Sequence, residues 1–87
     1  MKLKLKGSEA ASGVGTTNGS NVGSATLVRV HNSGSSDRVV SLETSANVII
    51  GTFSIGGGGT EYLEKDPTDE VFAAHAEILL VAVAYYS

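Results

Sequence analysis

The chain contains no cysteine and no tryptophan, and it has a single proline among its 87 residues. Without cysteine it can form no disulfide and lacks the Cys/His cluster of a structural zinc site. A domain this short buries only about 60 to 65% of the surface that its unfolded chain exposes, so its core must be thin. Small domains without such links commonly gain stability by association, and we expect a homo-oligomer or part of a symmetric assembly.

The lack of cysteine fits synthesis in a reducing cytoplasm and is also compatible with later exposure to an oxidising environment. Long apolar runs are missing too, since the longest extends only from Ile78 to Tyr86, far short of the roughly 20 residues of a membrane-spanning helix. The basic N-terminus is not followed by the apolar segment of a secretory signal. We therefore expect no contact with a membrane.

The charge balance is acidic, with six Lys/Arg against nine Asp/Glu and a formal net charge of −3. Such a balance does not favour nucleic acid as a partner. Three of the basic residues, Lys2, Lys4 and Lys6, alternate with Leu3 and Leu5. This alternation predicts a half-buried edge strand, or an arm that adds to a neighbour's sheet, with an ordinary solvated charged face as the alternative.

Residues 7–24 are rich in Gly, Ser, Asn and Thr and almost free of large apolar side chains. Their composition favours turns or a mobile loop over a packed element, with an ordinary disordered linker as the alternative. We expect residues 1–24 to form an N-terminal strand plus a flexible polar arm or loop, and residues 25–87 to form the folded domain.

Short β-branched segments separated by turn residues fill the rest of the chain. Residues 25–32 and 38–44 read as an antiparallel hairpin, and residues 60–65 as a further strand. Residues 48–55 and 77–86 are apolar on both faces, which predicts central strands or, for the second, a subunit contact. Gly51 is a candidate bulge, and the four glycines of residues 56–59 a hairpin turn.

Residues 67–75 differ from these segments, because a proline and two acids precede a run that contains two alanines. This order predicts one or two helical turns with Asp66 or Thr68 as the cap. The expected fold is therefore all-β: a small antiparallel β-sandwich, jelly-roll or Ig-like, with one short helical turn near residues 67–75.

No set of residues indicates a catalytic, cofactor or metal site. The four glycines lack the following helix and Lys-Ser/Thr pair of a phosphate loop. Asp66, Asp69 and Glu70 lack the spacing of an EF-hand and fit helix capping and compensation of the helix dipole better. His31 and His75 stand alone, and the many serines lack the context of an activated nucleophile. We expect no enzymatic activity and no cofactor.

Several segments together carry a resemblance to a known family: residues 22–30 (VGSATLVRV), 37–40 (DRVV), 50–55 (IGTFSI) and 64–69 (EKDPTD). Over about residues 20–87 the chain resembles small virion structural proteins encoded by tailed phages of marine cyanobacteria. The resemblance implies a capsid decoration (cement) protein on the particle surface, made in the host cytoplasm. Its implied partners are the major capsid protein, copies of itself, or both.

A cement role directs attention to the apolar residues at the two chain ends. We expect Leu3, Leu5, Tyr85 and Tyr86 to contribute to the partner interface, with packing inside the domain as the alternative for the tyrosines. The alternative function is a tail-fibre or baseplate module that recognises a host glycan or receptor through turn loops. The absence of tryptophan and the few aromatic residues disfavour a sugar site.

Overall fold

The structure, a computed structural model, describes the backbone of residues 2–86 and the side chains of residues 2–84. Strands dominate it, as expected of an all-β chain. Their bounds are β1 (Lys2–Leu5), β2 (Ala10–Ala11), β3 (Leu27–Asn32), β4 (Arg38–Glu43), β5 (Ile49–Ile55), β6 (Thr60–Glu64), β7 (Glu70–Ala73) and β8 (Ile78–Tyr86). The single helical element in this range is the 3-10 turn η1 (Thr16–Asn18).

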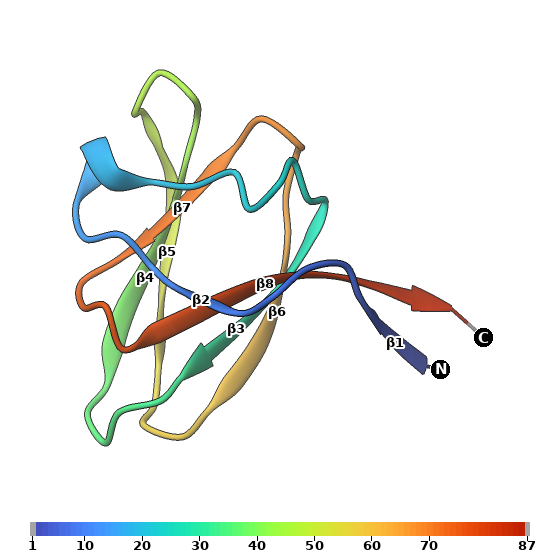
Figure 1. Ribbon diagram of the computed structural model, residues 1–87. Coiled ribbons are helices and arrows are strands. Elements are labelled where there is room, and N and C mark those ends of the chain that lie inside the picture. The colour runs from blue at the N-terminus through green and yellow to red at the C-terminus, as the bar shows by residue number, and fades with distance from the viewer. Residues whose placement is uncertain (1, 87) are drawn as a thin grey trace.

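Two antiparallel sheets face each other, which confirms the expected small β-sandwich (Figure 1). One sheet has the order β1-β8-β3-β6, with β2 also paired to β8, and the other has the order β5-β4-β7. β8 is central, as its apolar sequence predicts. It pairs with β3 on one edge and with β1 and β2 on the other.

The core lies between the sheets and follows the two-residue period of the strands. From the first sheet, Val28, Val30 and Ile78 point inward and are fully buried. From the second sheet, Val40 and Val71 meet them and are also fully buried. Burial of each such side chain contributes about 1.5–3 kcal/mol, so these few residues supply much of the stability of a small domain.

The helical turn expected near residues 67–75 is wrong. Residues 66–69 form a turn closed by the Asp69 amide, which donates to the Asp66 carbonyl at 3.0 Å, and the chain then enters β7. β7 pairs with β4, and its inward residues Val71 and Ala73 are buried. The proline and acids that resemble a helix start therefore form a turn, because burial of an alternating apolar pair outweighs a helix too short to be stable.

The expected hairpin of β3 and β4 is also wrong, since these strands belong to different sheets. Asn32 stabilises the crossing between them. Its fully buried amide donates to the carbonyls of Ser36 (2.7 Å) and Ile55 (3.0 Å), and its Oδ1 accepts from the Gly34 amide at 2.9 Å. A turn sequence alone does not distinguish a hairpin from such a crossing.

β5 lies at an edge of its sheet rather than at the centre. Its first residues are exposed, and the pairing register with β4 shifts where Gly51 and Ile49 face Leu42 and Glu43. This irregularity agrees with the predicted bulge around Gly51. The glycines of residues 56–59 form a tight turn in which the Gly59 amide donates to the Gly56 carbonyl at 2.9 Å, but this turn links the two sheets.

Residues 10–20 lie along one side of the sandwich and connect its two sheets. β2 pairs with β8, while Val14 and Ser20 form isolated bridges to Ala73 and Val71 of β7. The segment thus has more backbone pairing than its polar composition predicts. A division of the chain at residue 24 stays a prediction.

Candidate binding surface

β1 and the end of β8 project together beyond the rest of the sandwich (Figure 1). β3 pairs with β8 only as far as Ala82, whereas β1 pairs with β8 from Val83 to Tyr86. We call these two segments, Lys2–Leu5 and Val83–Tyr86, the projecting ribbon. Within the described residues each of its outer edges lacks a ladder partner, and such edges can accept a strand from another chain.

The leucines of the projecting ribbon are not buried. All of β1 is exposed, with Leu3 retaining 38% and Leu5 64% of its accessible surface. The half-buried strand expected from the Lys-Leu alternation is therefore wrong in its burial, because the register places Leu3 and Leu5 on the face opposite Val28, which points away from the second sheet. The backbones of Tyr85 and Tyr86 pair with β1, but their side chains lie outside the described residues, and their contribution to an interface stays a prediction.

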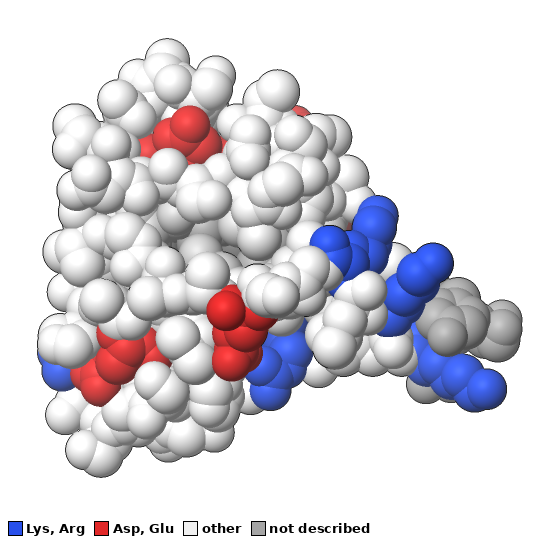
Figure 2. Space-filling view, in the orientation of Figure 1, with Lys and Arg blue, Asp and Glu red and all other residues white. Residues whose placement is uncertain are grey.

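The lysines give the projecting ribbon a charge opposite to that of the remaining chain. Lys2 and Lys4 point to the face opposite Leu3, and Figure 2 shows basic side chains clustered along this end of the molecule. Residues outside the Lys2–Lys6 segment include three Lys/Arg and nine Asp/Glu. The ribbon is thus a basic, amphipathic element attached to an acidic domain.

A groove of about 620 Å³ lies at the base of the ribbon, beside the part of β8 that β3 does not reach. Its lining includes Leu27, Glu64, Lys65 and Val83. Lys65 is almost fully buried, and burial lowers the pKa of its amine, while the nearby Asp69 and Asp66 oppose this shift. Its Nζ donates to the Asp66 carbonyl at 3.1 Å, so the lysine serves the turn before β7.

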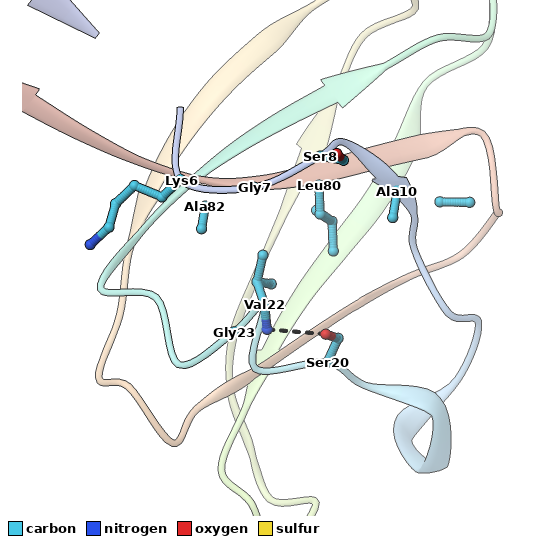
Figure 3. A pocket seen from close by; sticks show the side chains of 10 residues that line it. Lys6, Gly7, Ser8, Ala10, Ser20, Val22, Gly23, Leu80 and Ala82 are labelled. Carbon is cyan, nitrogen blue, oxygen red and sulfur yellow. Dashed lines mark hydrogen bonds between the residues drawn. The ribbon is translucent and has the colours of Figure 1, made fainter. Parts of the chain in front are cut away.

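A second cavity, of about 260 Å³, opens between residues 6–11 and the turn at residues 20–23 (Figure 3). Val22, Leu80 and Ala82 form much of its apolar lining, and Lys6 is its one charged residue. The Val22 amide donates to Ser20 Oγ at 3.0 Å. The described residues that line this cavity include no carboxylate and no histidine that could act as a general acid or base. These residues therefore form no catalytic set of side chains.

The carboxyl groups of Glu43 and Glu70 lie side by side on β4 and β7. The sequence patterns did not predict this pair. Glu43 is fully buried and is the cross-strand partner of Glu70. Burial raises the pKa of the Glu43 carboxyl, and the neighbouring Glu70 raises it further. Both carboxyl groups also approach Gly19, where a Cβ would lie 2.6 Å from Glu43 Oε2. The pairing was not predictable, because residues 43 and 70 are adjacent only through the strand register.

The other polar candidates are separate from one another. His31 Nδ1 lies 2.8 Å from Thr60 Oγ1, whereas His75 Nδ1 accepts from the Glu77 amide at 3.1 Å. Asp66 and Asp69 belong to a turn. In the described part of the chain, no three His, Cys, Asp or Glu side chains are grouped so that they could hold a metal ion.

An exposed apolar patch at the start of β5 is a further surface feature. Val48, Ile49 and Ile50 keep 61%, 45% and 53% of their surface exposed. These residues read as a buried central strand, but β5 lies at the edge of its sheet and they are exposed. Contiguous exposed apolar residues on an edge strand are typical of contact surfaces.

Comparisons with known proteins give no relative of this chain: no family model, no curated protein and no solved structure matches it. Among residues 2–86, no helix is long and apolar enough to cross a membrane.

Proposed function

We propose that this chain is a non-enzymatic virion structural protein, a capsid decoration (cement) protein that bridges and stabilises subunits of the shell. The observation that carries the proposal is the projecting ribbon, which exposes Leu3 and Leu5 on a strand with an open edge. Uncovered apolar side chains beside an open edge favour binding to another protein. The sequence resemblance of residues 20–87 to small phage virion proteins supports the major capsid protein as this partner.

Bridging requires two separate attachment surfaces on one molecule. The patch Val48–Ile50 supplies the second, and Figure 1 shows the start of β5 well away from the ribbon. Once one surface is attached, binding of the other becomes effectively intramolecular. On a symmetric shell each contact is repeated, so modest interfaces stabilise the particle strongly.

The direct test is co-sedimentation of the purified protein with mature heads, and separately with tails, of the phage that encodes it. We expect saturable binding to heads, in many copies per particle as shell symmetry requires. Binding to neither would contradict the proposal. Binding to tails in a few copies would contradict it too and would favour the host-recognition module instead.

The ribbon is tested with Leu3→Ser and Leu5→Ser combined. We expect this variant to lose most of its binding to heads, because the exposed leucines supply the apolar contact. Val39→Ser is the matched control, since Val39 is 44% exposed on β4, away from the ribbon. Equal binding by both variants would show that the ribbon is not the attachment surface.

A further inference from the structure

The first sheet ends in two edges of opposite charge. β1 forms one edge with Lys2 and Lys4, and β6 forms the other with Glu61 and Glu64. Both strands are largely exposed, and Leu3 and Tyr62 are 38% and 43% exposed. Because β1 and β6 lie at opposite ends of the same sheet, they do not pair within one molecule. The two edges can pair only if they belong to two different molecules.

The directions of the strands favour a head-to-tail meeting. Each neighbouring pair in β1-β8-β3-β6 is antiparallel, so β1 and β6 run in opposite directions. A second copy placed in the same orientation beside the first therefore brings its β6 antiparallel to β1. The result is one continuous antiparallel sheet, with no rotation of either copy required.

The faces of the strands agree with this arrangement. Directly paired residues lie on the same face of a sheet, and so do residues two apart on one strand. Lys4 pairs with Ala84 and Val28 pairs with Ala82, so Lys4 lies on the face of Val28. Val28 pairs with Leu63, so this face also carries Leu63 and, two residues before it, Glu61. By the same registers Leu3 lies on the opposite face with Tyr62. An antiparallel pairing that sets Leu3 beside Tyr62 thus sets Lys4 beside Glu61, giving an apolar pair and an ion pair.

We infer that the β1 edge of one copy pairs with the β6 edge of a second copy, so that copies of this chain associate head to tail through a continuous sheet. This inference goes beyond the proposed function, because it concerns copies of the chain and does not depend on a shell. Antiparallel pairing of two β1 edges would oppose lysine to lysine, because Lys2 and Lys4 lie on the same face. Like charges directly across a ladder are destabilising, so the β1 edge disfavours pairing with itself.

The test is a charge swap in solution. The mass of the wild-type protein, measured by light scattering after size exclusion, should rise with protein concentration. Lys4→Glu and Glu61→Lys should each associate about tenfold more weakly, as expected for an attraction turned into repulsion at one cross-strand pair. An equimolar mixture of the two variants should recover association, because each then offers the edge that the other needs.

The control is Asp37→Lys, which reverses an exposed acid in the turn before β4 and should associate as the wild type does. A wild type that stays monomeric at every concentration would overturn the inference. So would a mixture that does not recover, or a control that behaves like Glu61→Lys.

Cysteine cross-linking gives a second measurement that does not depend on charge. Because the chain has no cysteine, Leu3→Cys and Tyr62→Cys can be mixed and oxidised, and we expect a disulfide-linked heterodimer. Leu3→Cys mixed with Ser54→Cys, a position on the edge strand β5, should cross-link much less. Equal cross-linking of both mixtures would contradict pairing through β6.

Discussion

Glu43 and Glu70 are direct cross-strand partners on β4 and β7, and the salt bridges formed by the described residues include neither carboxylate. With no cation beside it, the buried Glu43 favours its protonated form, and its pKa is raised above 4.5. The central strand of the second sheet therefore contains a carboxyl group that retains its proton more readily when the chain is folded.

This pair predicts a pH dependence of stability. Because the folded state binds an extra proton between pH 4.5 and the raised pKa, the contribution of Glu43 is fully present below pH 4.5 and is lost as pH rises through the folded pKa. Glu43→Gln keeps the shape without the charge and should be more stable than wild type at pH 7, with the difference vanishing below pH 4.5. Chemical denaturation across this range measures it; a difference independent of pH would contradict the prediction.

The core and the exposed edge predict different costs for the same substitution. Ile78 is fully buried and Ile50 is 53% exposed. Ile78→Val should lower the free energy of unfolding by about 1 kcal/mol, because it leaves a space in close-packed surroundings. Ile50→Val should change it by less than about 0.5 kcal/mol. Urea denaturation of both variants measures the two free energies of unfolding. Equal losses of stability would mean that the side chain of Ile50 is buried and not exposed.

The buried amide of Asn32 should be essential to the crossing from β3 to β4. Asn32→Ala removes its donors and acceptor and leaves the Ile55 carbonyl and Gly34 amide without this partner. We expect a loss of about 2–4 kcal/mol in the free energy of unfolding. Asn21→Ala is the control, since its Oδ1 accepts a single exposed bond from the Ser24 amide at 3.2 Å; it should cost no more than about 1 kcal/mol. Thermal unfolding of both variants measures these losses. Equal losses of stability in Asn32→Ala and Asn21→Ala would contradict the role of Asn32.

The glycine turn between β5 and β6 offers a graded test. Gly58 has a φ of +77° and open space around a Cβ, so Gly58→Ala should cost about 1–2 kcal/mol from backbone strain alone. At Gly57 a Cβ would lie 2.5 Å from the Ser35 backbone, and Gly57→Ala should cost more. Gly56→Ala meets nothing closer than 3.5 Å and should be almost neutral. The order of the three unfolding midpoints is the measurement, and any other order would contradict this account of the turn.

Local patterns in the sequence determined the class of the fold. The alternation in residues 27–32 and the apolar run of residues 78–86 predict strands, and both are strands. In the first segment the side chains are buried with the two-residue period of a strand. The central place of β8 follows in the same way, since a strand apolar on both faces needs cover on both sides. Gly51 likewise marked a bulge.

Only the tertiary structure decided which strands are neighbours and which surfaces stay uncovered. Residues 48–50 read as buried, but β5 lies at an edge, and the Leu face of β1 points away from the other sheet. The segment at Pro67 resembles a helix start but forms a turn, because the residues after it pair with β4 as strand β7. The same pairing places Glu43 opposite Glu70. Local sequence fixes the period of a segment and the residues of its turns, whereas strand pairing joins residues far apart in the chain, and no local pattern encodes that choice.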